Sequence, residues 1–168
     1  MQRVIDNPRT GEHIVIRQSG ADTGGQLLDF DLVLQPGAHV PAGHSHPRQE
    51  ERFTVIAGRV RFRLGWRTVV AAPGTSVVVR SGTPHWFGNA GTDVAELRVE
   101  VRPALRMEEL LETCVERSTR ARAWWSRLID LALIPWDFPR EVGVPLVPSR
   151  LLAAALRPLA WLRPRLGS

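Results

Sequence analysis

The sequence predicts a mainly β fold, a jelly roll or a related barrel, followed by C-terminal α-helices. From residue 1 to about 102, short runs alternate apolar and polar side chains, as half-buried strands do. Gly, Pro, Asn and Asp separate these runs, and helical periodicity is missing there. After Pro103 the sequence is rich in Ala, Leu, Arg and Glu at helical spacing. We therefore expect a barrel over residues 1–102 and a helical extension over residues 103–168.

Two runs show the strand alternation most clearly. In residues 59–64 every second side chain is apolar, and the three intervening side chains are arginines. Residues 95–102 repeat this pattern with Glu and Arg on the polar face. Further strands are expected over residues 12–18, 26–34, 51–56, 66–71 and 76–80. Many short antiparallel strands of this kind form a jelly roll or a related barrel.

Three helices are expected after the boundary. The first covers about residues 105–117 and carries an apolar face made of Met107, Leu110, Leu111, Cys114 and Val115. The second covers about residues 118–134, and Pro135 is expected to end it. Prolines make residues 135–148 an extended connector, and a last helix follows over about residues 150–162.

The composition excludes several classes of protein. All 22 basic residues are arginine, against 17 acidic residues, and Cys114 is the one cysteine, so no internal disulfide can form. The basic excess does not alternate with stacking aromatic residues along a stripe, which argues against nucleic-acid binding. The first residues do not resemble a secretory signal, and no apolar run reaches the ~20 residues that cross a bilayer. We therefore expect a cytoplasmic protein.

Three histidines stand at positions where a barrel would bring them together. His44 and His46 are two residues apart, so on a strand both side chains project to the same face. His85 belongs to a later strand, reached after a turn that contains Gly82 and Pro84. A neighbouring strand could thus add a third imidazole to the first two.

A carboxylate on the next strand can join these histidines, and alternation selects which one. Glu51 has the strand parity of Phe53 and Val55, and Glu50 has the parity of the polar residues beside them. Glu51 is therefore expected to point into the barrel and Glu50 to point outwards.

This combination of donors predicts a metal site. Three imidazoles and a carboxylate are costly to bury unpaired, and a divalent cation removes that cost. Nitrogen and oxygen donors without thiolate suit Fe(II), Mn(II), Ni(II), Co(II) or Zn(II), with up to two positions of an octahedron left for substrate, water or dioxygen. The alternative is that the histidines are capping or hydrogen-bonded core residues.

The same region resembles the cupin superfamily. Its first motif is matched by Gly37, His44, His46, Glu51 and Gly58, with one extra residue between Gly37 and His44. Its second motif is matched by Gly74, Gly82, His85 and Asn89, with Arg80 where a proline is usual. The resemblance covers about residues 25–102. It implies a double-stranded β-helix (jelly-roll) barrel, frequently dimeric, with one metal ion held by His44, His46, Glu51 and His85.

The reaction does not follow from the fold and the metal set, because many activities share them. An apolar pocket for a small organic substrate could be lined by Phe53, Phe62, Trp66, Trp86 and Phe87, which could equally be core residues. We expect first an Fe-dependent dioxygenase-like oxidoreductase. The alternatives are a redox-neutral, metal-dependent isomerase or cyclase and a non-catalytic metal- or ligand-binding module.

The C-terminal tail allows two interpretations. Residues 142–168 hold four arginines and no acidic residue, and the arginines bracket a short apolar stretch. This stretch could lie in a membrane interface, or it could pack on the barrel or on a second subunit of a homodimer. Packing on protein is favoured because the stretch is short.

Overall fold

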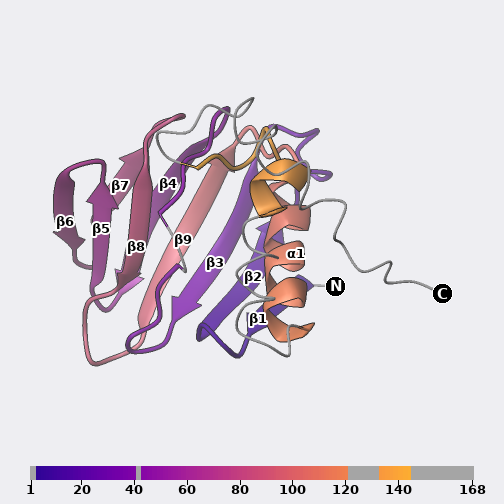
Figure 1. Cartoon of the computed structure of the whole chain (residues 1–168). Helices are drawn as coiled ribbons and strands as arrows, with labels where there is room; N and C mark the ends of the chain where they lie inside the picture. The colour runs from indigo at the N-terminus through magenta and orange to yellow at the C-terminus, as the bar shows by residue number, and fades with distance from the viewer. Residues whose placement is uncertain (1–2, 41–42, 121–132, 145–168) are drawn as a thin grey trace.

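The computed structural model describes residues 3–40, 43–120 and 133–144. These residues form nine strands and one long helix, shown in Figure 1. In chain order the elements are β1 (Arg3–Asn7), β2 (Glu12–Gln18), β3 (Leu28–Leu34), β4 (Glu50–Ala57), β5 (Val60–Leu64), β6 (Arg67–Ala71), β7 (Ser76–Val79), β8 (His85–Asn89), β9 (Ala95–Arg102) and α1 (Met107–Arg120).

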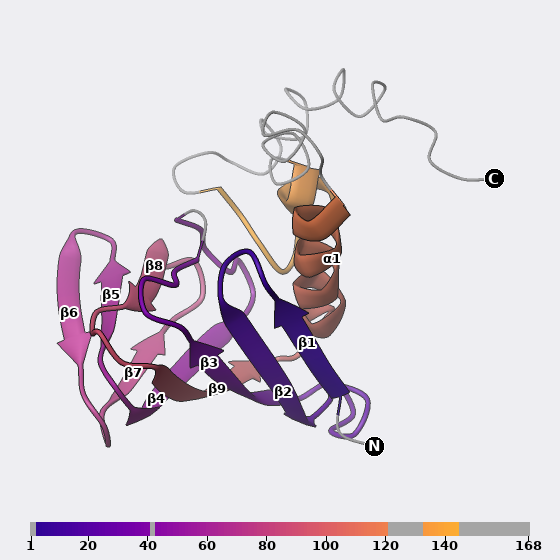
Figure 2. The same ribbon diagram turned by 90° about the horizontal axis from the view of Figure 1, so that it is seen from below.

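The strands form two antiparallel sheets. The larger sheet has the order β1-β2-β3-β9-β4-β7, and the smaller sheet has the order β6-β5-β8. Strands far apart in the sequence are neighbours, as in β3 beside β9 and β5 beside β8, which is the connectivity of a jelly roll. The small sheet and α1 lie on the same side of the large sheet (Figure 2). The predicted mainly β fold with a C-terminal helix is therefore confirmed.

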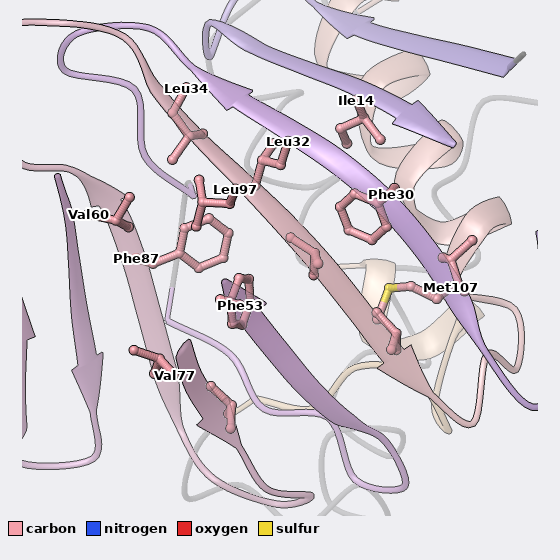
Figure 3. Close-up of a cluster of buried hydrophobic side chains, with 14 of the residues drawn as sticks. Ile14, Phe30, Leu32, Leu34, Phe53, Val60, Val77, Phe87, Leu97 and Met107 are labelled. Carbon is pink, nitrogen blue, oxygen red and sulfur yellow. The ribbon is translucent and has the colours of Figure 1, made fainter. Parts of the chain in front are cut away.

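The core lies between these layers. The inward side chains of β9, from Ala95 to Val101, are at most 1% exposed, and the polar residues between them face outwards. Figure 3 shows Phe53 of β4, Phe87 of β8 and Leu97 of β9 meeting between the sheets. Met107 brings the start of α1 onto the same core. The inward side chains of the alternating strands thus form one continuous apolar interior.

One strand was not predicted, and its sequence explains why. In β1 only Ile5 and Asn7 are buried, so a polar residue occupies one of its two buried positions. Apolar alternation is therefore too weak to indicate a strand there. Strand β1 forms instead by pairing with β2. Its Arg3 makes ion pairs with Glu108 and Glu112 of α1, at 2.6 and 2.5 Å.

Helix α1 begins and ends later than the sequence suggested. The chain leaves β9 at Arg102, and α1 then runs past residue 117, where the first helix was expected to end. Glu108 and Glu109 in its first turn stabilise the positive end of the helix dipole. Cys114 packs against the core, and burial raises the pKa of its thiol to about 11, which agrees with a packing role.

Pro135 does not end a helix as expected. Residues 133–137 are helical, and the Phe138 amide donates to the Ile134 carbonyl at 2.9 Å in the turn after the proline. Proline lacks only its own N–H, so helical bonds beyond it can still form. The expected last helix over residues 150–162 lies outside the described residues. None of the helices in the described ranges has the length and apolar character needed to cross a bilayer.

Gly58, between β4 and β5, supports a prediction about folding. Its φ is +72°, and an added Cβ would lie 2.6 Å from the Val94 carbonyl oxygen, against backbone that cannot move aside. Gly58→Ala is therefore expected to lower the free energy of unfolding by about 3 kcal/mol, the sum of the positive-φ cost and overpacking. Gly74→Ala is the matched control, because Gly74 has a φ of +83° and open space around its Cβ position. Urea denaturation measures both, and equal losses would contradict the clash.

Candidate metal centre

Backbone pairing brings the histidines together. His44 and His85 form an isolated antiparallel bridge, in which the His44 amide donates to the His85 carbonyl at 3.0 Å and the reverse bond is 2.8 Å. His46, two residues further, projects to the same side, and its ring centroid lies 4.9 Å from that of His44. The ligand nitrogens of the three histidines all lie within 4.8 Å of one another.

The carboxylate beside them comes from β4. Glu51 is buried, and its Oε2 lies 3.3 Å from His46 Nε2 and 3.1 Å from His85 Nε2. Glu50, the preceding residue, is half-buried and stands opposite Arg102 of β9. The structure therefore places Glu51, the carboxylate with inward parity, at the histidine cluster.

Two backbone carbonyls determine which imidazole nitrogens carry hydrogen. His46 Nδ1 contacts the Glu141 carbonyl oxygen, and His85 Nδ1 lies 3.1 Å from the Thr83 carbonyl oxygen. A carbonyl oxygen only accepts hydrogen bonds, so each Nδ1 must be the donor. In the neutral rings the Nε2 atoms then carry the lone pairs, and both face Glu51.

This arrangement leaves three buried acceptors facing one another. His46 Nε2, His85 Nε2 and Glu51 Oε2 are buried without a hydrogen-bond partner. If His46 Nε2 carries a proton, it can donate a hydrogen bond to Glu51. His85 Nε2 then still faces the same carboxylate oxygen, and two acceptors cannot bond each other. A divalent cation can accept a lone pair from all three atoms and from His44. The three histidines form a group that could hold a metal ion, and Glu51 lies against two of them, so this donor set fits a divalent metal site.

The charges at the site agree with this chemistry. Burial acts to raise the pKa of Glu51, but His46 and His85 outweigh it and hold that pKa well below its usual range. Burial acts to lower the pKa of His46, but the Glu51 carboxylate and the Glu141 carbonyl outweigh it and raise that pKa. Glu51 is thus ionised at neutral pH and available as a metal ligand.

Comparison with known proteins gives the family. Residues 30–101, which include all four of these residues, match the sequence profile of the cupin domain. Residues 30–101 of the barrel are a cupin domain. The profile match lies within the region that resembles the cupin superfamily in the sequence, and it leaves the α1 region and the rest of the extension uncovered.

Solved structures support the same fold. KdgF from Halomonas sp. shares 19% identity with this chain and has a TM-score of 0.52, with 60% of this chain and 87% of that chain covered. A predicted oxalate decarboxylase from Thermotoga maritima shares 21% identity with a TM-score of 0.51, covering 61% of this chain and 92% of the other. At such identities the likeness establishes the cupin fold alone. No match was found among functionally curated proteins.

Three of the aromatic residues expected to line a pocket are core residues of the cupin barrel. Phe53, Phe62 and Phe87 are at most 6% exposed, and their ring centroids lie between 4.9 and 5.9 Å apart. Trp66 lies in the turn after β5 and is 94% exposed, so it contacts neither this cluster nor the histidines. The three phenylalanines fill the space between the sheets rather than enclosing a ligand.

Trp86 lines a hollow, but on the outer face of the small sheet. Its indole N–H donates to the Val40 carbonyl at 2.9 Å. The outward arginines Arg61 and Arg63 stand on the same face, with the buried Phe62 between them in β5. This hollow of about 550 Å³ is lined by Gly43, Arg61, Arg63, Gly65, Thr68, Pro84, His85 and Trp86. Since the His85 ring turns towards Glu51, the hollow and the metal centre lie on opposite faces of β8.

Sequence reasoning missed the two residues whose carbonyls orient the histidines, Thr83 and Glu141. A backbone carbonyl is present on every residue, so no residue type indicates its role. Thr83 precedes the predicted ligand His85 by two residues, which is a weak local signal. Glu141 is 95 positions from His46, and only the folded chain brings them together.

Proposed function

We propose that this cupin binds one divalent metal ion, Fe(II), and acts on a small organic molecule as a dioxygenase-like oxidoreductase. The observation that supports the metal is the group of buried acceptors at His46, His85 and Glu51, which no single proton can satisfy. His44 is the most exposed of the four proposed ligands, so a substrate reaches the centre from its side.

The donor set supports Fe(II) as the first candidate. Three imidazoles and one carboxylate leave up to two octahedral positions open, and bound Fe(II) supplies the redox change on which dioxygen chemistry depends. Mn(II), Ni(II), Co(II) and Zn(II) suit the same donors. The protein contributes by orienting His46 and His85 through fixed carbonyls and by excluding water from Glu51, which is 6% exposed.

The test uses the full chain stripped of metal and reloaded anaerobically with Fe(II). Among structural relatives, an oxalate oxidase in complex with glycolate (20% identity, TM-score 0.51) makes small carboxylates a sensible first substrate panel. We expect dioxygen uptake that depends on both Fe(II) and one substrate. Substrate conversion without dioxygen uptake would support a redox-neutral isomerase or cyclase instead.

A non-catalytic metal- or ligand-binding module is the second candidate. The packing of Phe53, Phe62 and Phe87 supports it, because these rings fill the interior beside Glu51 where an apolar substrate pocket was expected. A metal-loaded protein that binds a small molecule stoichiometrically without converting it, under air and with each candidate metal, would favour this module.

Metal affinity is expected to depend on pH in a direction set by His46. Its pKa is raised above the ordinary value of 6.5, and only the neutral ring binds metal. Affinity is therefore expected to fall as the pH drops through that raised pKa, beginning above pH 6.5, by about tenfold per pH unit for one competing proton. Titration with Ni²⁺ at pH 8, 7 and 6 measures this. Equal affinities at the three pH values would contradict it.

The protein is further proposed to be a cytoplasmic homodimer without a nucleic-acid partner. Strand β6 ends the small sheet without a further strand in the described part of the chain, and it carries Val70, 53% exposed, four residues after the exposed Trp66. Pairing of such an edge with a second copy would cover both side chains. Analytical ultracentrifugation of the wild type and of Trp66→Ser tests this, and a monomeric wild type would refute it. The expected packing or membrane contact of the tail stays a prediction for residues 145–168.

A further inference from the structure

We propose that residues 138–144, named here the strap, are part of the metal centre, with the Glu141 backbone carbonyl positioning the ligand His46. The strap belongs to the C-terminal extension and lies outside residues 30–101 that define the cupin domain. This inference rests on the proposed metal binding and adds that the extension controls it.

The strap is attached to the barrel beside the centre. Ser45 and Gly143 form an antiparallel bridge, with the Ser45 amide donating at 3.0 Å and the Gly143 amide at 2.8 Å. Ser45 stands between the two histidine ligands of its segment. The bridge therefore holds the strap against the chain that carries both His44 and His46. In Figure 2 this orange segment runs between α1 and the small sheet.

The other end of the strap is anchored in the core and at Arg106, the residue before α1. Phe138 and Val142 are buried in the core cluster, and the Arg106 guanidinium lies 4.7 Å from the Phe138 ring centroid. The buried Glu141 side chain accepts a hydrogen bond from the Arg106 amide at 3.3 Å. An ion pair between Arg117 of α1 and Asp137 holds the residues just before the strap. Arg106, just before α1, and Arg117 of α1 thus hold the chain on which the position of the Glu141 carbonyl depends.

The carbonyl acts on His46 in two ways. By accepting the Nδ1–H it selects the tautomer with its lone pair on Nε2, and it fixes the ring so that Nε2 faces Glu51. Without it, His46 could turn or carry its proton on Nε2, and either change removes a ligand. The strap also covers the ring, which is 4% exposed.

Thermodynamic linkage makes this coupling reciprocal. If a docked strap increases metal affinity, a bound metal ion must stabilise the docked strap by the same factor. Displacing the strap should therefore change metal affinity, and adding metal should change the stability of the docked strap. The second effect can be measured on the wild-type chain.

The first test adds a side chain at the Ser45–Gly143 bridge. A Cβ at Gly143 would lie 3.2 Å from Ser45 Oγ and 3.4 Å from Pro47 Cγ, so Gly143→Val is expected to displace the strap. We expect Zn²⁺ affinity to fall by about 10- to 100-fold, with loss of the protected His46 Nδ1–H signal in the NMR spectrum of the zinc-loaded protein. Gly91→Val is the matched control, because nothing lies closer than 3.6 Å to a Cβ at Gly91; it should change neither readout.

The second test uses the wild-type chain. Hydrogen exchange of the Gly143 amide is expected to slow when Zn²⁺ is added, and exchange of the Gly74 amide, in a turn away from the centre, is not. Gly143→Val that loses the His46 signal but binds Zn²⁺ as tightly as the wild type would overturn the positioning role. Unchanged Gly143 exchange in a zinc-loaded wild type would overturn it as well, even if the variant fails to fold. A wild type that binds no metal would instead refute the proposed function.

Discussion

Replacement of His85 by alanine is expected to abolish metal binding. His85 Nε2 lies 3.1 Å from Glu51 Oε2, and the Thr83 carbonyl holds its ring in place. The affinity of a site with four protein ligands is expected to fall more than about 100-fold when one imidazole is lost, since even supporting residues change it 10- to 100-fold. Elemental analysis of purified, dialysed protein measures the metal content per chain.

Two further variants separate ligand loss from unfolding. His44→Ala removes a half-exposed side chain, so it should lose metal with little damage to the core. His39→Ala is the control, because His39 is an exposed histidine beside Trp86 and lies outside the cluster of metal-ligating nitrogens. Circular dichroism and thermal melting verify the fold. Full metal content in both His85→Ala and His44→Ala would rule out this centre.

Replacement of Glu51 by glutamine is expected to have the second largest effect. The substitution keeps the shape of the side chain but removes the negative charge of the carboxylate. That charge would balance a divalent cation bound by three neutral imidazoles. Metal affinity should fall more than about 100-fold, because a neutral amide oxygen is a far weaker ligand than a buried carboxylate. Isothermal titration with Mn²⁺ or Zn²⁺ on the metal-stripped protein measures the change.

Glu50→Gln is the matched control for that variant. The two glutamates are adjacent on β4, but Glu50 is half-buried on the other face, opposite Arg102. Its substitution should leave metal affinity within about twofold of the wild type, since a screened surface charge contributes little. Equal losses in the two variants would mean that net charge, rather than coordination, attracts the metal.

The sequence by itself determined the barrel and the direction of Glu51. Apolar alternation requires no distant contact to be recognised, because side chains of a strand alternate between two faces wherever the strand lies. Residues 95–102 therefore form β9 with the bounds expected, and parity separates Glu51 from Glu50. The spacing of His44 and His46 places both rings on one side for the same reason.

The tertiary structure alone decided what fills the interior between the two sheets. Alternation points Phe53, Phe62 and Phe87 inwards, but only the packing of one sheet on the other shows that their rings fill the interior, and Trp66, in a turn, is exposed. The Glu141 carbonyl reaches His46 only because the extension folds back over 95 positions. Local patterns record the direction of a side chain, whereas cavities and backbone hydrogen bonds between distant segments depend on how the layers pack.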